Sequence, residues 1–248
     1  MVEQKEGIRM DIVKQYFELI KEKAEPAYES QKDTIKKIAA MFAECMDHLG
    51  VVQLFGVRHG EEFMNELNYR AGGIAPFHGL KLKEMVLRGY VDQKDVDSGK
   101  VYEDLSVIDK FPKLYDLDDR DMYCLISFYG NEPLIVEMAK RAKEKGQKVV
   151  GVVNKKSYDS HGGTLLDYCD LFLDMGADEP DEAIDLNGTK IGQLSSTVSN
   201  ILAQMITAEI YAYFTAKGKE VPILLSANVK GADVHNNSLT DPYGRRVR

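Results

Sequence analysis

Residues 127–133 combine several groups that could bind an anion. The segment reads Ser-Phe-Tyr-Gly-Asn-Glu-Pro and follows a short apolar run. Ser127 and Tyr129 supply hydroxyl groups, and Gly130 allows the backbone to approach a ligand closely. A helix that begins at Pro133 would point the positive end of its dipole at the same place. The segment therefore fits either an anion-binding loop or an ordinary turn between a strand and a helix.

A second polar segment, residues 56–60, reads Gly-Val-Arg-His-Gly and follows another apolar run. Histidine is the side chain that most readily exchanges a proton near neutral pH, so His59 suits ligand contact or acid–base chemistry. Arg58 offers a planar fork of donors that could hold a phosphate or a carboxylate. The same guanidinium could instead pair with an acid of the following helix, at Glu61, Glu62 or Glu66.

A cluster of three hydroxyl residues precedes a long helical pattern: Ser195, Ser196 and Thr197. One such residue would serve as an ordinary helix cap, whereas three in a row leave spare hydroxyls for a ligand. None of the polar segments matches a Walker A or a G-x-G-x-x-G motif. The sequence therefore gives no direct support for a nucleoside triphosphate or a dinucleotide.

The elements that must position these groups follow an alternating pattern. Short apolar runs indicate buried parallel strands, and they lie at 51–56, 122–128, 148–153, 170–174 and 221–226. Helical patterns lie between or after them, at 61–70, 133–145 and about 192–216. The first fifty residues are helical with a break expected at Pro26. This alternation predicts a doubly wound α/β fold, in which ligands bind beyond the carboxyl ends of the strands.

Composition limits the class of protein. The chain has 248 residues, 44% of them hydrophobic, and a formal net charge of -8, so broad electrostatic binding to nucleic acid or to a membrane is not expected. No apolar run resembles a signal peptide or a membrane span. Three widely spaced cysteines show no metal-binding spacing, and we expect a cytoplasmic protein without a metal. The acidic stretch 81–121 is expected to form short helices that are solvated on their outer side.

Four stretches, in order along nearly the whole chain, resemble the SIS (sugar isomerase) phosphosugar-binding family and within it the UPF0309-type proteins. They are residues 55–74 with Asn-Tyr-Arg-Ala-Gly-Gly, 127–139, 190–198, and 225–236 with Ser-Ala-Asn-Val and a downstream His-Asn. The resemblance implies an α/β, Rossmann-like three-layer sandwich with a five-stranded parallel sheet. It also implies that N-terminal helices in 1–50 pack on the core and on a partner subunit, while 51–248 form the phosphosugar-binding part of a single domain.

The same resemblance implies roles for individual residues. Glu66 matches the position of a catalytic base, and Arg70 lies one helical turn further on. Further residues match positions that contact the sugar or its phosphate, and they are Ser127, Tyr129, Gly130, Ser195, Ser196, Thr197 and Asn228. His59 or His235 would handle the sugar oxygens. The first loop departs from the family because it has lost its hydroxyls and gained Arg58, and the histidine that phosphoheptose isomerase carries on its long helix has no counterpart.

These features predict a phosphosugar-binding protein that forms a homodimer or homotetramer and needs no cofactor. The expected reaction is aldose–ketose isomerisation through removal of a proton next to a carbonyl group. Two alternatives remain open from the sequence. One is etherase or lyase chemistry on an amino-sugar phosphate, and the other is a phosphosugar sensor whose site has lost catalysis.

Overall fold

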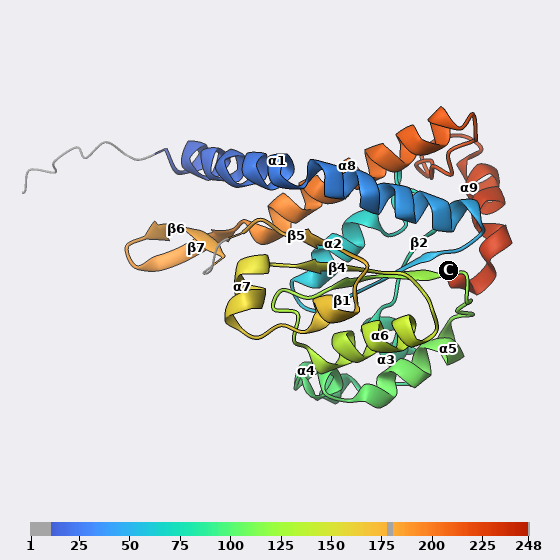
Figure 1. Cartoon of the computed structure of the whole chain (residues 1–248), viewed down its shortest axis with the longest axis horizontal. Helices are drawn as coiled ribbons and strands as arrows, with labels where there is room; N and C mark the ends of the chain where they lie inside the picture. The colour runs from blue at the N-terminus through green and yellow to red at the C-terminus, as the bar shows by residue number, and fades with distance from the viewer. Residues whose placement is uncertain (1–10, 178–180, 248) are drawn as a thin grey trace, which may run out of the picture.

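The computed structural model of the chain describes residues 11–177 and 181–247. Its centre is a five-stranded parallel sheet (Figure 1). In spatial order the strands are β2 (Phe77–Gly79), β1 (Val52–Gly56), β3 (Met122–Ile126), β4 (Val149–Val153) and β5 (Leu171–Asp174). The chain runs from β1 outward to β2 and then returns past β1 to β3, so the strand order reverses between β1 and β3. A parallel sheet of this kind binds ligands at that switch point.

The strands are apolar because helices cover both faces of the sheet. Side chains alternate along β3: Cys124 and Ile126 pack into the core on one face, and Tyr123 and Leu125 pack into the core on the other. The first face is covered by α1 (Ile12–Asp47), α2 (Gly60–Leu67) and α8 (Ser195–Ala216), with α1 and α8 lying side by side (Figure 1). This arrangement confirms the predicted three-layer α/β sandwich.

The second face is covered by α6 (Pro133–Glu144) and by the acidic segment between β2 and β3. That segment forms α3 (Leu82–Leu87), α4 (Gln93–Asp97), η1 (Lys100–Tyr102), η2 (Leu105–Lys110) and α5 (Phe111–Leu114). Beyond β4 the chain adds α7 (Lys155–Ser160) and η3 (Leu165–Tyr168). The expectation of short helices between residues 81 and 121 agrees with this description.

The predicted break at Pro26 is wrong, because α1 continues through it as a single helix of 36 residues. Tertiary contacts directly after the proline hold this part of the helix in place. The amide of Gln31 donates to Asp174 O at 3.0 Å and accepts from Asp174 N at 2.7 Å, and Ala27 is buried against Gly176. These contacts with the end of β5 outweigh the local cost of a proline within a helix.

Residues 221–226 are not a strand of the sheet, contrary to the sequence prediction. Their backbone instead pairs with the segment before β2, where Ile223 forms an isolated antiparallel bridge with Ile74. Leu224 N donates to Gly73 O at 2.9 Å, and Ala75 N donates to Pro222 O at 2.8 Å. The fifth strand of the sheet is β2, whose three residues are too few to show a pattern.

The hairpin β6 (Glu182–Leu186) and β7 (Thr189–Gln193) lies between β5 and α8 and was not predicted. Its turn has left-handed φ values of 57° at Asn187 and 85° at Gly188, as an Asn-Gly hairpin turn requires. Gln193 O accepts a hydrogen bond of 2.6 Å from the Tyr16 hydroxyl, which ties the hairpin to α1. Because β7 occupies residues 189–193, α8 begins at Ser195 and not near residue 192.

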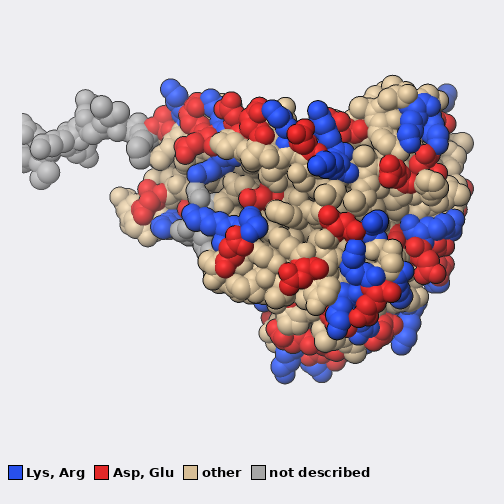
Figure 2. All heavy atoms as spheres, in the orientation of Figure 1, with Lys and Arg blue, Asp and Glu red and all other residues tan. Residues whose placement is uncertain are grey.

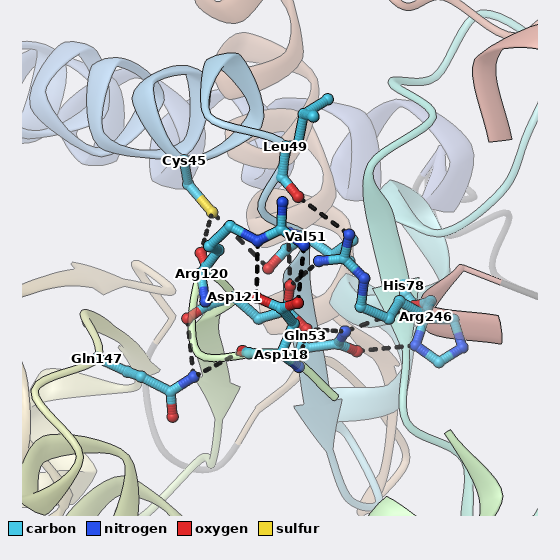
Figure 3. A network of polar contacts seen from close by, with 10 residues as sticks. All are labelled: Cys45, Leu49, Val51, Gln53, His78, Asp118, Arg120, Asp121, Gln147 and Arg246. Carbon is cyan, nitrogen blue, oxygen red and sulfur yellow. Dashed lines mark hydrogen bonds and ion pairs between the residues drawn. The ribbon is translucent and has the colours of Figure 1, made fainter. Parts of the chain in front are cut away.

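The last described residues form α9 (Ala232–Thr240) and η4 (Asp241–Arg246). Arg246 is buried and forms an ion pair of 2.7 Å with Asp121, which is also buried (Figure 3). The Asp121 carboxylate also accepts hydrogen bonds from Val51 N and from the Gln53 amide. The chain end is therefore fastened beside the amino ends of β1 and β3.

Candidate functional site

A cavity of about 330 Å³ lies beyond the carboxyl ends of β1 and β3, at the point where the strand order reverses. We call it the strand-end cavity. Its lining comes from the loop after β1, the loop after β3 and the start of the β6–β7 hairpin, and consists of Val57, Arg58, His59, Phe128, Tyr129, Glu132, Asp181 and Glu182. The basic residues of this lining, Arg58 and His59, come from one loop.

Close packing shapes the loop after β1. A Cβ atom at Gly56 would lie 2.5 Å from Gly60 O, and a Cβ atom at Gly60 would lie 2.8 Å from Ile126 O. Both glycines are therefore needed for the loop to fold tightly over the end of β3. Arg58 has a left-handed φ of 55°, and Gly60 N donates to Val57 O at 2.9 Å. This turn exposes the side chains of Arg58 and His59 at the cavity.

Arg58 does not pair with the glutamates of α2, so that alternative from the sequence is not found. Its guanidinium carbon instead lies 5.1 Å from the ring centre of Tyr102, as in a cation–π contact. Burial raises the pKa of the Tyr102 phenol, so Arg58 meets a neutral ring. Within residues 11–177 and 181–247, Arg58 forms no ion pair with a carboxylate.

The hydroxyl of Ser127, expected to contact phosphate, is occupied by the loop that contains it. Ser127 Oγ accepts a hydrogen bond of 2.7 Å from Gly130 N and donates a short hydrogen bond to the carboxylate of Glu132. Gly130 has a φ of 67°, and a Cβ atom there would lie 2.3 Å from the Tyr158 ring. Gly130 therefore allows this compact turn, and Glu132 rather than Ser127 faces the cavity.

Tyr129 contributes an aromatic wall to the cavity. Its ring centre lies 5.1 Å from that of Phe128 and 4.5 Å from that of His161, and the side chain is half-buried against the core. The His59 ring centre lies 6.0 Å from that of Phe128. Aromatic faces of this kind suit the apolar side of a sugar ring.

The start of α8 is capped by the chain itself. Ser195 N and Ser195 Oγ donate to the Asp181 carboxylate at 2.7 and 2.6 Å, and Leu194 N donates to it at 3.2 Å. Thr197 Oγ1 lies 3.3 Å from the Tyr16 hydroxyl. Ser196 Oγ is buried and has no hydrogen-bond partner within the described part of the chain. The three hydroxyls predicted to act together, Ser195, Ser196 and Thr197, therefore lie in three different environments.

Glu66, the predicted base, lies outside the strand-end cavity. It lines a separate open cleft of about 620 Å³ between α2 and α8, together with Thr197, Asn200 and Gln204. The Gln204 amide donates to Glu66 at 2.6 Å, and Arg70, which follows the end of α2, forms a close ion pair with Glu66. The helix predicted over 61–70 ends at Leu67, so Glu66 and Arg70 do not share a helix face as expected, although they form an ion pair. Within one chain neither residue lines the strand-end cavity with His59.

His235 and Asn228 lie near the amino end of the sheet. His235 Nε2 is 2.9 Å from Ile223 O, and the neighbouring Asn236 amide bonds in both directions to the Leu225 backbone. These bonds fix residues 223–225 beside the segment that leads into β2. Figure 1 shows α9, which carries His235, at the end of the molecule opposite the β6–β7 hairpin. His235 and Asn228 therefore do not share the cavity with His59 in one chain.

The structure thus brings together Arg58, His59 and Tyr129, with Ser127 and Gly130 shaping the loop beneath them. Sequence reasoning missed the contribution of Phe128, Glu132, Asp181 and Glu182. Glu132 stood inside the segment considered, directly before the helix-starting Pro133, where an acid favours the helix dipole. Nothing in the sequence around Asp181 and Glu182 indicated a role at the site, because only the β6–β7 hairpin brings them to the cavity.

The remaining surface gives a mixed picture of charge. Acidic and basic side chains are interspersed on the face shown in Figure 2. No helix in the described ranges is both long and apolar enough to cross a bilayer. Among those same residues, no group of three or more histidine, cysteine or acidic side chains is arranged to hold a metal ion.

Comparison with known proteins agrees with the fold. A UPF0309 protein of Geobacillus kaustophilus is 28% identical over 244 residues, which cover 95% of this chain and 96% of that protein. A phosphoheptose isomerase from Francisella tularensis superposes with a TM-score of 0.52 at 16% identity, covering 80% of this chain and 98% of that one. The Vibrio vulnificus NanR protein complexed with ManNAc-6P gives a TM-score of 0.53 at 11% identity. The superposition covers 94% of this chain and 69% of that one.

A family match covers more than half of the chain and includes the loops after β1 and β3. Residues 15–154 match the family described as the SIS domain. Together with the parallel sheet and the switch-point cavity, this match confirms the resemblance seen in the sequence. The chain belongs to the SIS domain family.

Proposed function

We propose that this protein binds a phosphorylated sugar in the strand-end cavity and isomerises it between aldose and ketose forms. Membership in the SIS domain family supports phosphosugar binding, and solved neighbours of the same fold include a phosphoheptose isomerase. The observation that carries the proposal is the cavity itself. It joins an imidazole, a guanidinium, three carboxylates and aromatic walls at the switch point of the sheet.

Isomerisation requires a base at the carbon that loses a proton and a group that moves a proton at the sugar oxygens. His59 suits the second task, because its ring is exposed at the cavity and can donate or accept a proton. Glu132 suits the first task, because its carboxylate lines the same cavity and is held by the Ser127 hydroxyl. Glu66 was the expected base, but its bonds to Gln204 and Arg70 orient it toward the other cleft. We therefore assign the base to Glu132.

Two matched variants test this assignment. Glu132→Gln is expected to lower turnover of the accepted sugar phosphate by about a hundredfold or more, with binding changed only a few-fold, because the amide cannot accept the proton. Glu66→Gln is expected to retain turnover within several-fold. The measurement is a coupled assay of aldose and ketose phosphates with each purified variant, together with product analysis for any released acid.

The opposite pattern, with turnover lost in Glu66→Gln and kept in Glu132→Gln, would move the base to Glu66. A released acid would favour etherase or lyase chemistry. If the wild-type protein turned over no member of a broad panel of sugar phosphates, isomerase activity would have to be abandoned.

A specific observation favours a second candidate function, a phosphosugar sensor without catalysis. The hydroxyls of Ser127 and Ser195 are both bonded to the chain's own acids, Glu132 and Asp181, so the expected phosphate contacts are already engaged. A sensor would bind without turnover. Ligand at about one hundred times its dissociation constant would add about 2.7 kcal/mol to the free energy of unfolding. Thermal-shift screening beside the turnover assay separates the two functions.

A further inference from the structure

We infer that the anionic group of the ligand is held by Arg58, in the loop after β1, and not by the starts of α6 and α8. The inference rests on the proposed binding of a phosphosugar in the strand-end cavity. The sequence led us to expect phosphate contacts in the loop after β3. In this arrangement the loop after β1 holds the phosphate, and the loop after β3 supplies the acid–base carboxylate. The sugar would lie with its anionic end toward Arg58 and its reacting end toward Glu132.

The start of α6 already has an anion. Glu132 precedes Pro133, the first residue of the helix, and its carboxylate accepts the hydrogen of the Ser127 hydroxyl. Gly130 N, another donor of this turn, is used by Ser127 Oγ. A phosphate placed here would lose these donors and would face the Glu132 carboxylate. Two like charges at such short range repel strongly in a partly enclosed cavity.

The start of α8 likewise has a carboxylate of the chain bound to it. The Asp181 carboxylate accepts from Leu194 N, Ser195 N and Ser195 Oγ, all within 3.2 Å. A ligand phosphate could reach these donors only by displacing Asp181. It would then lie beside that displaced acid and beside Glu182, which also lines the cavity. Each of the two helix starts that could attract an anion therefore already has a carboxylate of the chain beside it.

Among the described residues of the cavity lining, Arg58 is a cation that no carboxylate pairs with. It is exposed, and its guanidinium lies against the neutral ring of Tyr102. An exposed cation–π contact is weak, so a phosphate can draw the guanidinium away at little cost. The guanidinium presents a fork of N–H donors that matches two phosphate oxygens. His59, the next residue, is the other basic group of the lining.

The test is a titration with inorganic phosphate followed by phosphorus NMR, using Arg58→Gln and Arg70→Gln as matched variants. Both substitutions remove one positive charge from an exposed arginine, but Arg70 is paired with Glu66 outside the cavity. We expect the dissociation constant for phosphate to rise at least tenfold in Arg58→Gln and to stay within about twofold in Arg70→Gln. Glu132→Gln is expected to bind phosphate as tightly as the wild type or more tightly, because a like charge is removed.

Several outcomes would overturn the inference. They are equal binding by wild type and Arg58→Gln, a tenfold loss in Ser127→Ala instead, or no binding of phosphate by the wild type. Circular dichroism of each variant checks the fold, because Arg58→Gln removes the contact with the Tyr102 ring. Turnover measured on the same preparations separates this result from the proposed function. Phosphate binding that depends on Arg58, without turnover, refutes the isomerase and leaves the inference standing.

Discussion

His78 is a buried histidine that belongs to the polar network at the amino ends of β1 and β3 (Figure 3). Its Nδ1 lies 2.8 Å from Gln53 Oε1, and the Gln53 amide nitrogen donates to Asp121 at 3.0 Å. Because Gln53 therefore offers its oxygen to the histidine, Nδ1 of His78 carries the hydrogen. Burial, assisted by the charge of Lys81, lowers the pKa of His78 to about 4.

This lowered pKa predicts a pH-dependent stability. The unfolded imidazole takes up a proton near about pH 6.5, whereas the folded one does so only near pH 4. The contribution of His78 is therefore complete above the first value and is lost as pH falls toward the second. We expect the free energy of unfolding to fall by about 2 kcal/mol between about pH 7.5 and pH 5 from this residue. Urea unfolding at both pH values measures it.

The control for this prediction is His78→Asn, whose amide can still donate toward Gln53 but does not titrate. Its free energy of unfolding should lose about 2 kcal/mol less over the same pH interval than that of the wild type. Parallel curves for the two proteins would show that His78 does not govern this pH dependence.

Residue types near the site could be predicted from the sequence, but their partners could not. Arg58 and His59 were recognised because they follow an apolar run predicted to be a strand, and they do line the cavity. The engagement of Ser127 by Glu132, five residues later, was missed although both stood in one segment. The engagement of Ser195 by Asp181 depends on a hairpin that no local pattern of the serines reveals.

Elements were predictable where burial determines the residue types. The strands β1, β3 and β4 are buried throughout and appear in the sequence as continuous apolar runs. The weaker predictions failed where tertiary contacts decide the outcome, as at Pro26 in α1 and at residues 221–226, which pair with the segment before β2. The hairpin had one available signal, Asn187-Gly188, which is typical of a tight turn.

The start of α8 leads to a prediction about helix capping. Asp181→Ala removes the acceptor for Leu194 N, Ser195 N and Ser195 Oγ, so we expect a loss of about 1 to 2 kcal/mol in the free energy of unfolding. The neighbouring Glu182→Ala removes the same charge from the same cavity but is exposed. It should cost less than about 0.5 kcal/mol.

Denaturant unfolding of the two variants at one pH provides the comparison. Equal losses would mean that the charge of the hairpin, and not the cap on α8, sets the stability. Phosphate binding measured on the same pair shows whether α8 becomes an anion site once its own acid is gone. The inference about Arg58 predicts a similar, modest change for both variants.

In the molecule as a whole, the amino ends of the strands are packed and buried, whereas their carboxyl ends border an open cavity. At the amino ends, the Arg246 guanidinium reaches the buried Asp121 and the Leu49 carbonyl, so the last described helix is locked to the core (Figure 3). A buried pair of this kind needs both partners, since either charge alone would be costly to bury. At the carboxyl ends, the strand-end cavity is open and its basic groups are exposed.

The most direct measurement is a crystal structure of the protein with the sugar phosphate that raises its melting temperature most. We predict that the ligand lies in the strand-end cavity, with its phosphate on the Arg58 guanidinium and its carbonyl end between His59 and Glu132. A phosphate on Ser127 and the first turn of α6, or a sugar in the cleft beside Glu66, would contradict this account. So would a complete panel of sugar phosphates that leaves the melting temperature unchanged.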